Sequence, residues 1–379
     1  MLLTIDDLRR ASRRRLPRAV FDFIDGGAED EVTLRRNRRA FERFALVPRV
    51  LVDVHQVELE TTVLGERVAA PLVLAPTGLC GMATSRGEIP AARAAVEAGI
   101  TFTASCMSSV TLEEIAREAP GRHWFQLYVW RDRGITRDLV ERAASAGYRV
   151  LVVTVDTPVL GRRERDVRNG ATIPPRITPR NALDTLRRPR WLLTMARGPR
   201  VTFANVALPA RPGGASPFAL SPFVNSLFDS SLTWSDLDWL RGLWRGPLVV
   251  KGVMSPDDAV LAAEHGADGI VVSNHGGRQL DGAEGTLDAL PAVVEAAGDR
   301  LEILLDGGVR RGADLAKALA LGARACMVGR PYLYGLAVAG QDGVAHAIRI
   351  LTSELVRTMA LTGCARVDQL GRERIAHRP

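Results

Sequence analysis

Short apolar runs rich in β-branched residues alternate with amphipathic stretches along most of the chain. Stretches such as GEIPAARAAVEAG and SPDDAVLAAEHG end at glycine, as helices commonly do. Because parallel strands need helical crossovers, this alternation predicts an α/β fold, a (β/α)8 TIM barrel. The eight predicted strands are Pro71–Thr77, Thr101–Ser105, Trp124–Tyr128, Val150–Asp156, Leu248–Gly252, Gly269–Asn274, Glu302–Asp306 and Ala325–Gly329.

The connection between the fourth and fifth strands is several times longer than the others. Residues 170–230 within it are rich in Pro, Arg, Gly and Ser, and an irregular stretch of that length is usually functional or disordered. Its segment RRPRWLLTMARGPR is expected to be a lid helix packed on the barrel, or else a membrane- or partner-contacting segment. Residues 1–65 are expected to form a helical extension, with Thr4 as the first N-cap, before a barrel over 66–370. The chain, 1–379, is predicted to be a single domain.

Composition excludes several classes of protein. The chain is 46% hydrophobic and 25% charged, which is typical of globular domains. Its four cysteines have neither CxxC spacing nor histidine partners, so we predict no disulfide scaffold and no metal site. The first residues do not resemble a secretory signal, and no apolar run approaches about eighteen residues, so a cytoplasmic location is expected.

The net charge of +7 comes almost entirely from arginine, since the only lysines are Lys251 and Lys317. A bias of that kind is weak evidence for a basic, non-enzymatic binding protein, and with aromatic residues at only 5% we predict no nucleic-acid partner. Lys317 falls in a helix and is expected to be solvated. Lys251 falls in an apolar strand, where a buried amine requires an anionic partner such as a substrate or cofactor.

Polar residues gather where the predicted strands end, which is where barrel enzymes build their active sites. Glycines beside Arg310 and Arg330 follow strands seven and eight, the usual phosphate site of this fold. After strand six, SNHGGR places His275 near Arg278, which suits proton transfer next to a bound carboxylate. The same end of the barrel is expected to present Asp156, Arg163, Gln126 and Tyr128.

Seven motifs stand in one order: APTG, FQLYV, TVDTP, VVKGV, SNHGGRQLDG, DGGVRRG and GRPYLYGLA. With them, the chain resembles the FMN-dependent 2-hydroxy acid oxidases and dehydrogenases from LPRAVFDFIDGG to about Leu370. That family includes glycolate and lactate oxidases, lactate dehydrogenases and mandelate dehydrogenase. Another phosphate-binding barrel, such as a nucleotide dehydrogenase, would share the glycines of strands seven and eight but not the HGGR motif.

The resemblance implies a role for each matching residue. His275, oriented by Asp156, would remove a proton while FMN accepts two electrons and the (S)-2-hydroxy acid becomes a 2-oxo acid. Arg278 and Arg163 would bind the substrate carboxylate, Tyr128 its hydroxyl, and Lys251 would stabilise the reduced flavin. The FMN phosphate would be held by Asp306, Gly307, Gly308, Arg310, Gly329 and Arg330. The rest of the flavin would be lined by Pro76, Thr77, Gly78, Ser105, Gln126, Thr154 and Ser273.

Two positions depart from the family's usual pattern. Phe23 stands where a tyrosine usually helps to hold the carboxylate, which removes a hydrogen bond of about 1 kcal/mol and makes the pocket more apolar. Met107 stands where glycolate oxidase-like members have tryptophan. Together with Gly78, which resembles mandelate dehydrogenase, they favour an aryl substrate such as mandelate, with lactate or another aliphatic acid as the alternative.

The insertion bears on the electron acceptor. It resembles the corresponding stretch of mandelate and lactate dehydrogenases that sit on the membrane and reduce quinones. The resemblance therefore favours a dehydrogenase in peripheral contact with the inner face of the cell membrane through 170–230. The alternative is a soluble oxidase that uses oxygen. The resemblance also implies a homotetramer.

Overall fold

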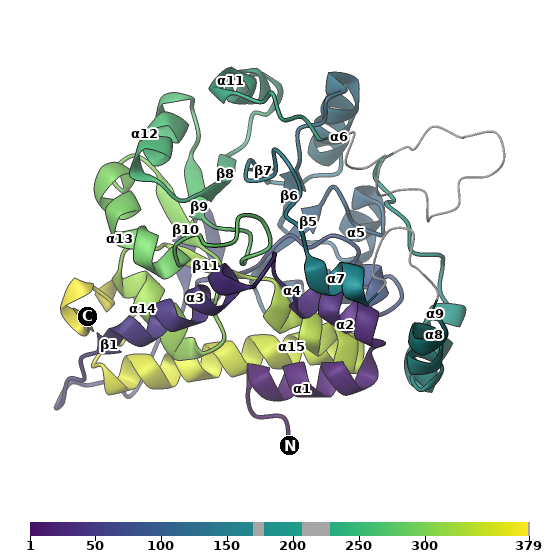
Figure 1. Ribbon diagram of the computed structural model, residues 1–379. Coiled ribbons are helices and arrows are strands. Elements are labelled where there is room, and N and C mark those ends of the chain that lie inside the picture. Colours follow the sequence, from purple (N-terminus) through teal and green to yellow (C-terminus); the bar gives the residue numbers. More distant parts are fainter. Residues whose placement is uncertain (170–177, 207–227, 378–379) are drawn as a thin grey trace.

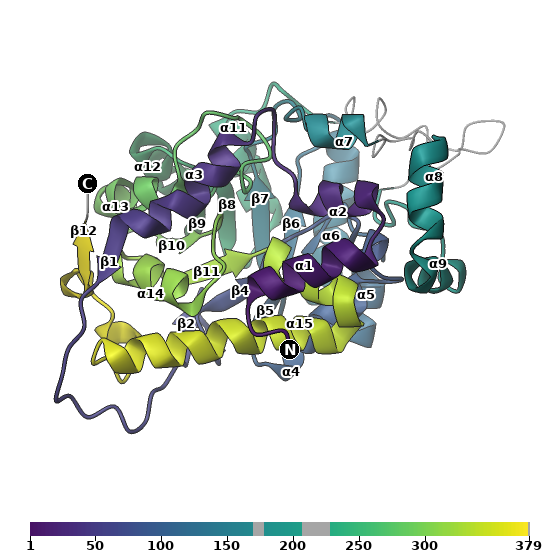
Figure 2. The same ribbon diagram turned by 60° about the horizontal axis from the view of Figure 1, so that its bottom comes forward.

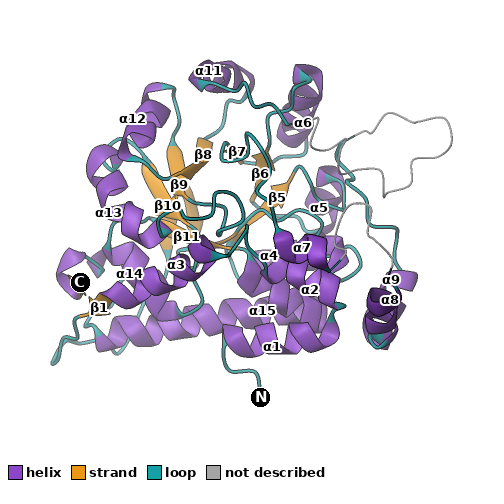
Figure 3. Ribbon diagram, viewed as in Figure 1, coloured by secondary structure: helices purple, strands orange, loops and turns teal. Residues whose placement is uncertain are grey.

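Eight parallel strands close into a barrel in the computed structural model, which describes residues 1–169, 178–206 and 228–377 (Figures 1 and 3). Around the barrel the strands follow the order β10-β11-β4-β5-β6-β7-β8-β9, so the predicted TIM barrel is confirmed. Each lies within about two residues of its predicted position. The barrel strands are β4 (Leu72–Leu74), β5 (Thr101–Ser105), β6 (His123–Leu127), β7 (Val150–Thr154), β8 (Leu248–Val253), β9 (Gly269–Val272), β10 (Glu302–Leu305) and β11 (Ala325–Val328).

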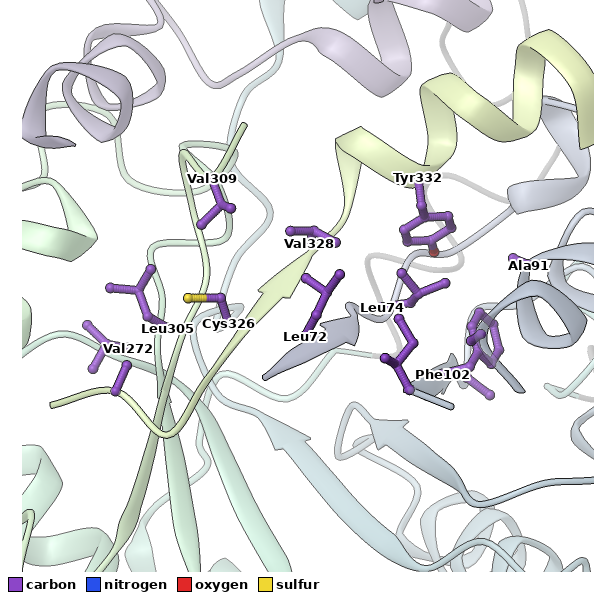
Figure 4. Packing of buried hydrophobic residues seen from close by; sticks show 14 of the residues in the cluster. Leu72, Leu74, Ala91, Phe102, Val272, Leu305, Val309, Cys326, Val328 and Tyr332 are labelled. Carbon is purple, nitrogen blue, oxygen red and sulfur yellow. The ribbon is translucent and has the colours of Figure 1, made fainter. Parts of the chain in front are cut away.

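Helices cover the outside of the barrel (Figure 3). Side chains alternate along each strand. Leu72 and Leu74 belong to the cluster that packs against the helices (Figure 4), whereas Val73 belongs to the separate cluster inside the barrel. The helices that follow the strands are α4 (Glu88–Glu97), α5 (Leu112–Glu118), α6 (Arg133–Ser145), α11 (Trp234–Leu243), α12 (Pro256–Glu264), α13 (Thr286–Ala297), α14 (Gly312–Ala320) and α15 (Arg330–Leu361). Short 3-10 turns are η1 (Phe41–Arg43), η2 (Cys80–Met82), η3 (Val367–Gln369) and η4 (Arg372–Arg374).

Apolar side chains fill the interior of the barrel towards the N-terminal ends of the strands. Trp124, Val152 and Val249 belong to a buried apolar cluster inside the barrel. The hairpin of β2 (Thr61–Val63) and β3 (Glu66–Val68) adds apolar side chains to this cluster. Because the strand period is two, the next inward positions above these three residues are Gln126, Thr154 and Lys251. Towards the C-terminal ends of the strands, the interior of the barrel therefore changes from apolar to polar side chains.

The N-terminal extension is helical, with α1 (Ile5–Arg15), α2 (Arg18–Asp25) and α3 (Val32–Ala40). Thr4 caps α1 in a reciprocal capping box with Asp7. Helix α1 packs along α15, as Figure 2 shows, and β1 (Phe44–Leu46) pairs with β12 (Ile375–His377). These contacts attach both ends of the chain to the barrel and bring α2 to its mouth.

In its described part, the connection from β7 to α11 contains the short helices α7 (Glu164–Arg168), which precedes residue 170, and α8 (Pro179–Leu186) and α9 (Pro189–Ala196), which lie in the insertion. Helix α8 packs against α2, and the backbone N–H of Arg18 donates to Asp184 at 2.6 Å. The indole of Trp191 donates to the carbonyl of Met82 at 2.9 Å. Leu186 remains 68% exposed, so α8 presents an apolar side chain to the outside. Residues 170–177 and 207–227 of the predicted insertion lie outside the described part of the chain.

Two smaller expectations have different outcomes. Lys317 is not freely solvated: it is half-buried and its ammonium donates to the carbonyl of Phe41 at 2.8 Å. That contact was not predictable because η1 lies far from α14 in the sequence. The four cysteines, Cys80, Cys106, Cys326 and Cys364, are buried and free. In the described ranges, no helix is long and apolar enough to cross a bilayer.

Helix α15 bends sharply at Ala339 and Gly340, and its two halves cross at Gly335 and Gly343. We predict that Gly343→Ala destabilises the protein by about 3 kcal/mol, because the added Cβ would lie 1.9 Å from the carbonyl oxygen of Gly335. Thermal unfolding of the holoenzyme measures the change. Gly242→Ala is the matched control: this exposed helical glycine has no atom within 4 Å of the new Cβ, so alanine should stabilise by about 0.5–1 kcal/mol. Equal effects of the two substitutions would contradict the prediction.

Candidate active site

A cavity of about 540 Å³ opens at the ends of the strands. Its volume is typical of a site that binds a cofactor or small molecule. Most residues predicted for the site line it, and they come from α2 and from the ends of β4 to β11. The predicted residues that line the cavity are Phe23, Pro76, Thr77, Gly78, Ser105, Met107, Gln126, Tyr128, Thr154, Arg163, Lys251, His275, Arg278, Asp306, Gly307, Gly308, Arg310, Gly329 and Arg330.

His275 stands at the mouth of the barrel beside Asp156. Its backbone has φ of +57° and is followed by Gly276 and Gly277, also at positive φ, so the turn lifts the imidazole out of the strand. Nδ1 of His275 lies 2.9 Å from Oδ1 of Asp156. This contact leaves Nε2 to face the cavity and gives the pair the geometry of a general base held by a carboxylate.

Asp156 lies behind His275 and does not line the cavity. Burial alone would raise the pKa of Asp156, but the neighbouring His275 and Lys251 outweigh burial and lower it. The carboxylate therefore remains ionised, and it can stabilise positive charge that develops on His275 when the imidazole takes a proton.

Lys251 is buried and paired, as its position in an apolar strand required. Its ammonium lies 2.8 Å from Oδ2 of Asp306 and 2.8 Å from Oγ of Ser273. Burial would lower the pKa of Lys251, but the charges of Asp306 and Asp156 outweigh it and raise the pKa. A permanently charged ammonium thus reaches the floor of the cavity.

Three polar side chains form a hydrogen-bonded row across the tops of β5, β6 and β7. Ser105 donates to Oε1 of Gln126 at 2.7 Å, and Nε2 of Gln126 donates to Thr154 at 3.0 Å. All three are buried and all three line the cavity. Strand register pairs Ser105 with Gln126, and Thr154 is the next inward-facing residue after Val152, the partner of Gln126. The row can donate to and accept from a flat heteroaromatic ring.

The opposite end of the cavity is cationic and rich in glycine. Gly307 and Gly308 have φ of +87° and +88°, conformations that glycine adopts without strain. In the described part of the chain, the side chain of Arg310 donates a single hydrogen bond, to the carbonyl of Val309 at 2.7 Å. Burial and nearby arginines lower the pKa of Arg310, so an anion beside it would stabilise its charged form.

Arg330 differs from Arg310 in its surroundings. It donates to the carbonyls of Ile24, Gly26 and Gly276 at 2.8–3.1 Å, which ties the end of α2 to the loop after β9. Arg330 therefore shapes the site by joining two segments. Arg310 is the guanidinium with the larger free hydrogen-bonding capacity.

Two guanidiniums lie over the ring of Phe23. The guanidinium carbon of Arg163 is 5.1 Å and that of Arg278 is 5.4 Å from the ring centroid. Arg278 also donates to the carbonyls of Phe23 and Gly26. Burial, together with the charges of Arg163 and Arg330, lowers the pKa of Arg278. Two cations held this close favour an anionic ligand between them.

The wall beside Tyr128 is apolar. Phe228 packs edge-on against Tyr128 at 5.1 Å between ring centroids, and both line the cavity with Met107 and Phe203. A Cβ on Gly78 would lie 3.0 Å from that of Met107, so glycine there gives this side of the cavity its width. Sequence reasoning missed Phe228 and Phe203, because both come from the insertion, outside every motif.

Two residues expected at the cofactor site have partners within the protein. Ser273 does not line the cavity; its buried hydroxyl instead accepts from Lys251 and from the backbone N–H of His275. The carboxylate of Asp306, which was expected at the phosphate, is paired with Lys251, and its negative charge would repel a phosphate. Oδ1 of Asp306 is buried without a hydrogen-bond partner, so it is placed to accept from a hydroxyl or an N–H of a ligand.

Comparison with known proteins decides which ligand this cavity serves. The family model described as FMN-dependent dehydrogenase matches residues 12–377. The chain belongs to this family. Its cofactor is therefore FMN.

Curated relatives and solved structures agree with that assignment. The L-lactate oxidase of Nostoc sp. is 45% identical over 97% of this chain and 96% of its own length. The L-lactate dehydrogenase of Caulobacter vibrioides is 46% identical over 98% of this chain and 97% of its own. Among solved structures, the monotopic membrane protein (S)-mandelate dehydrogenase matches with a TM-score of 0.95 and 40% identity over the whole of both chains. A mandelate oxidase matches with a TM-score of 0.83 and 40% identity over 99% of this chain and 98% of its own.

The cavity suits FMN in both chemistry and size. An unpartnered carboxylate oxygen on Asp306, the row from Ser105 to Thr154 and the buried ammonium of Lys251 are groups that a polar ring and its ribityl hydroxyls require. The cationic end at Arg310 suits the phosphate. No group of three or more His, Cys, Asp or Glu side chains is arranged to hold a metal ion anywhere in the described ranges.

Proposed function

We propose that this protein oxidises an (S)-2-hydroxy acid to the 2-oxo acid, with His275 as the base. The single observation that carries the proposal is the His275–Asp156 pair, 2.9 Å apart, at the mouth of a cavity that also holds two stacked arginines. Bound FMN would supply the acceptor for the two electrons and for the second hydrogen that the substrate loses. All 379 residues act as one domain in this proposal.

The residues divide the reaction among them. Arg163 and Arg278 bind the substrate carboxylate, which fixes the α-carbon between the cofactor side and His275. Tyr128 bonds the substrate hydroxyl, and burial raises the pKa of Tyr128, so it remains a neutral hydrogen-bond donor. His275 takes the proton released on oxidation, and Asp156 stabilises the imidazolium that results.

Lys251 supports the cofactor end of the site. Its buried ammonium is already balanced by Asp306, so it stays charged in the folded protein. Negative charge arriving on the flavin would be stabilised by this fixed cation, which needs no reorganisation when the electrons arrive.

We propose an aryl substrate of the mandelate type. The side-chain wall consists of Met107, Phe203, Phe228 and the ring of Phe23, all apolar. The 5.1 Å contact of Phe228 with Tyr128 leaves an aromatic face towards the place where the substrate side chain would lie. Lactate is the second candidate, because relatives named for lactate are 45% and 46% identical to this chain.

The first experiment is anaerobic titration of the holoenzyme with (S)-mandelate and with (S)-lactate, followed by loss of flavin absorbance. Bleaching by mandelate at a much lower concentration than by lactate would support the aryl assignment. The reverse order would favour lactate as the substrate instead. No bleaching by any 2-hydroxy acid would refute the proposed function.

We predict that Phe228→Ala lowers kcat/KM for (S)-mandelate by about tenfold or more and leaves that for (S)-lactate within a few-fold. Lactate has only a methyl group at the position of the phenyl ring, so it loses little contact with the wall. Steady-state kinetics with both substrates measure the ratio. Equal losses for the two acids would mean that Phe228 supports the site without contacting the side chain.

We propose quinone as the electron acceptor and a peripheral contact with the inner face of the cell membrane, with oxygen and a soluble enzyme as the alternative. Support comes from the exposed Leu183, Leu186 and Leu193 on α8 and α9, which lie among arginines. A structural neighbour is described as a monotopic membrane protein. Sedimentation with anionic vesicles tests the contact, and quinone-dependent turnover compared with oxygen consumption tests the acceptor.

We also propose that the protein is a homotetramer, which sedimentation velocity would test.

A further inference from the structure

Asp166 is a buried carboxylate in the substrate end of the cavity that no step above uses. It belongs to α7 and lines the cavity while only 6% of its surface is exposed. Oδ2 lies 3.3 Å from Nε of Arg163, and Oδ1 is buried without a hydrogen-bond partner. Only one of the two carboxylate oxygens therefore has a partner, and the presence of such a carboxylate in a binding site requires an explanation.

The neighbouring charges explain why Asp166 is present in the cavity. Arg163 and Arg278 both lie over the ring of Phe23, and the charge of Arg163 destabilises the charged form of Arg278. Asp166 offsets that repulsion, since its charge favours the charged form of Arg278 and it is paired with Arg163. The helical turn of α7 fixes the pair, because the backbone N–H of Asp166 donates to the carbonyl of Arg163 at 3.1 Å.

We infer that Asp166 is the positioning residue of this arginine pair: it holds Arg163 over Phe23 and, while ionised, weakens the attraction of the pair for the substrate carboxylate. The inference rests on the proposed function, in which Arg163 and Arg278 bind that carboxylate. Two cations with one resident anion bind a second anion less tightly than two cations alone. Such a site releases its 2-oxo acid product more easily.

The charge state of Asp166 should therefore couple ligand affinity to pH. Burial raises the pKa of Asp166, while Arg163 and Arg278, and then Arg165, oppose the rise, and Glu31 adds to it. A bound carboxylate adds negative charge and raises the pKa further, so binding takes up a proton. Affinity must then increase as pH falls through the pKa of Asp166, and the increase must be absent when the charge is removed.

The test is binding of 2-oxo-2-phenylacetate and of pyruvate to the holoenzyme, followed by the change in FMN absorbance from about pH 5 to about pH 9. Both probes carry the carboxylate, so the result does not depend on the side-chain preference. At alkaline pH, Asp166→Asn should bind the probes about tenfold more tightly than the unaltered protein, because it keeps the size and one oxygen but not the charge. The difference should narrow as pH falls. His275 is present in both proteins, so its contribution cancels in the comparison.

Asp22→Asn is the matched control. Asp22 is a buried acid on α2 that lies 3.6 Å from Arg165 and does not line the cavity. It should leave the affinity and its pH dependence unchanged. An equal effect of the two substitutions would overturn the inference, because it would reflect net charge alone. Unchanged or weaker binding by Asp166→Asn would overturn it as well.

A second measurement covers the case in which Asp166→Asn does not retain FMN. Calorimetry of probe binding to His275→Asn in buffers of different ionisation enthalpy counts protons without the histidine's contribution. Uptake at about pH 5.5 that disappears at about pH 8.5 supports the inference, and no uptake at either pH overturns it. If the unaltered holoenzyme binds neither probe, the proposed function fails, whereas binding without any effect of Asp166 overturns the inference alone.

Discussion

His275→Gln should retain FMN and slow its reduction by a 2-hydroxy acid by about 10²- to 10⁴-fold. Glutamine keeps a polar side chain near Asp156 but cannot accept the proton that leaves the substrate. Lys251, Asp306 and Arg310, which are proposed to hold the cofactor, have other partners than His275, so FMN should remain bound. Anaerobic stopped-flow measurement of flavin absorbance gives the rate directly.

The control for this prediction is His265→Gln. His265 lies at the C-terminal end of α12, contacts Asp238 of α11 and does not line the cavity. Its replacement should therefore leave the rate unchanged. A His275→Gln rate within a few-fold of the unaltered protein would remove histidine from the reaction. Loss of FMN from the variant would instead give His275 a role in holding the cofactor.

Lys251→Met should lower the midpoint potential of the bound flavin, on the order of 50 mV, and destabilise the protein by about 3–5 kcal/mol. The potential falls because a fixed cation no longer stabilises negative charge on the cofactor. Stability falls because Asp306 is left as an unpaired buried carboxylate. Spectroelectrochemical titration measures the first effect and thermal unfolding the second.

The double variant Lys251→Met with Asp306→Asn separates the two effects. Removing both charges should restore most of the stability. Replacing both members of a buried ion pair lowers the free energy of unfolding much less than removing one member and leaving the other unpaired. The midpoint potential should stay low, because the cation is still missing. A potential that recovers in the double variant would show that Lys251 acts only through Asp306.

Periodicity was enough to predict the barrel and the inward-facing residues. Each strand is a short β-branched run, and a period of two places Thr154 above Val152 and Lys251 above Val249 whatever the details of the fold. Positions of that kind depend only on local geometry. For the same reason, the glycines that let His275 project from its strand were recognisable in HGG.

Pairings between distant segments were not predictable in the same way. The sequence required an anion for Lys251, and the barrel supplies it from β10 as Asp306. The sequence could not place Asp306 beside Lys251, because one residue type fits several partners until the positions of the strands are known. Phe228 was missed because nothing local distinguishes an aromatic residue that returns to the cavity from one on the surface.

The sequence by itself therefore determined the barrel, the family and the chemical groups at its mouth. These follow from short-range rules: strand period, helix ends, the few residues that can transfer a proton or bind an anion, and motif order. Only the tertiary structure decided which charges face each other, that Arg330 joins two segments while Arg310 is left for a ligand, and that Asp166 is paired with Arg163 in the cavity. Electrostatic and packing energies depend on distances through space, and those distances exist only once the chain has closed the barrel.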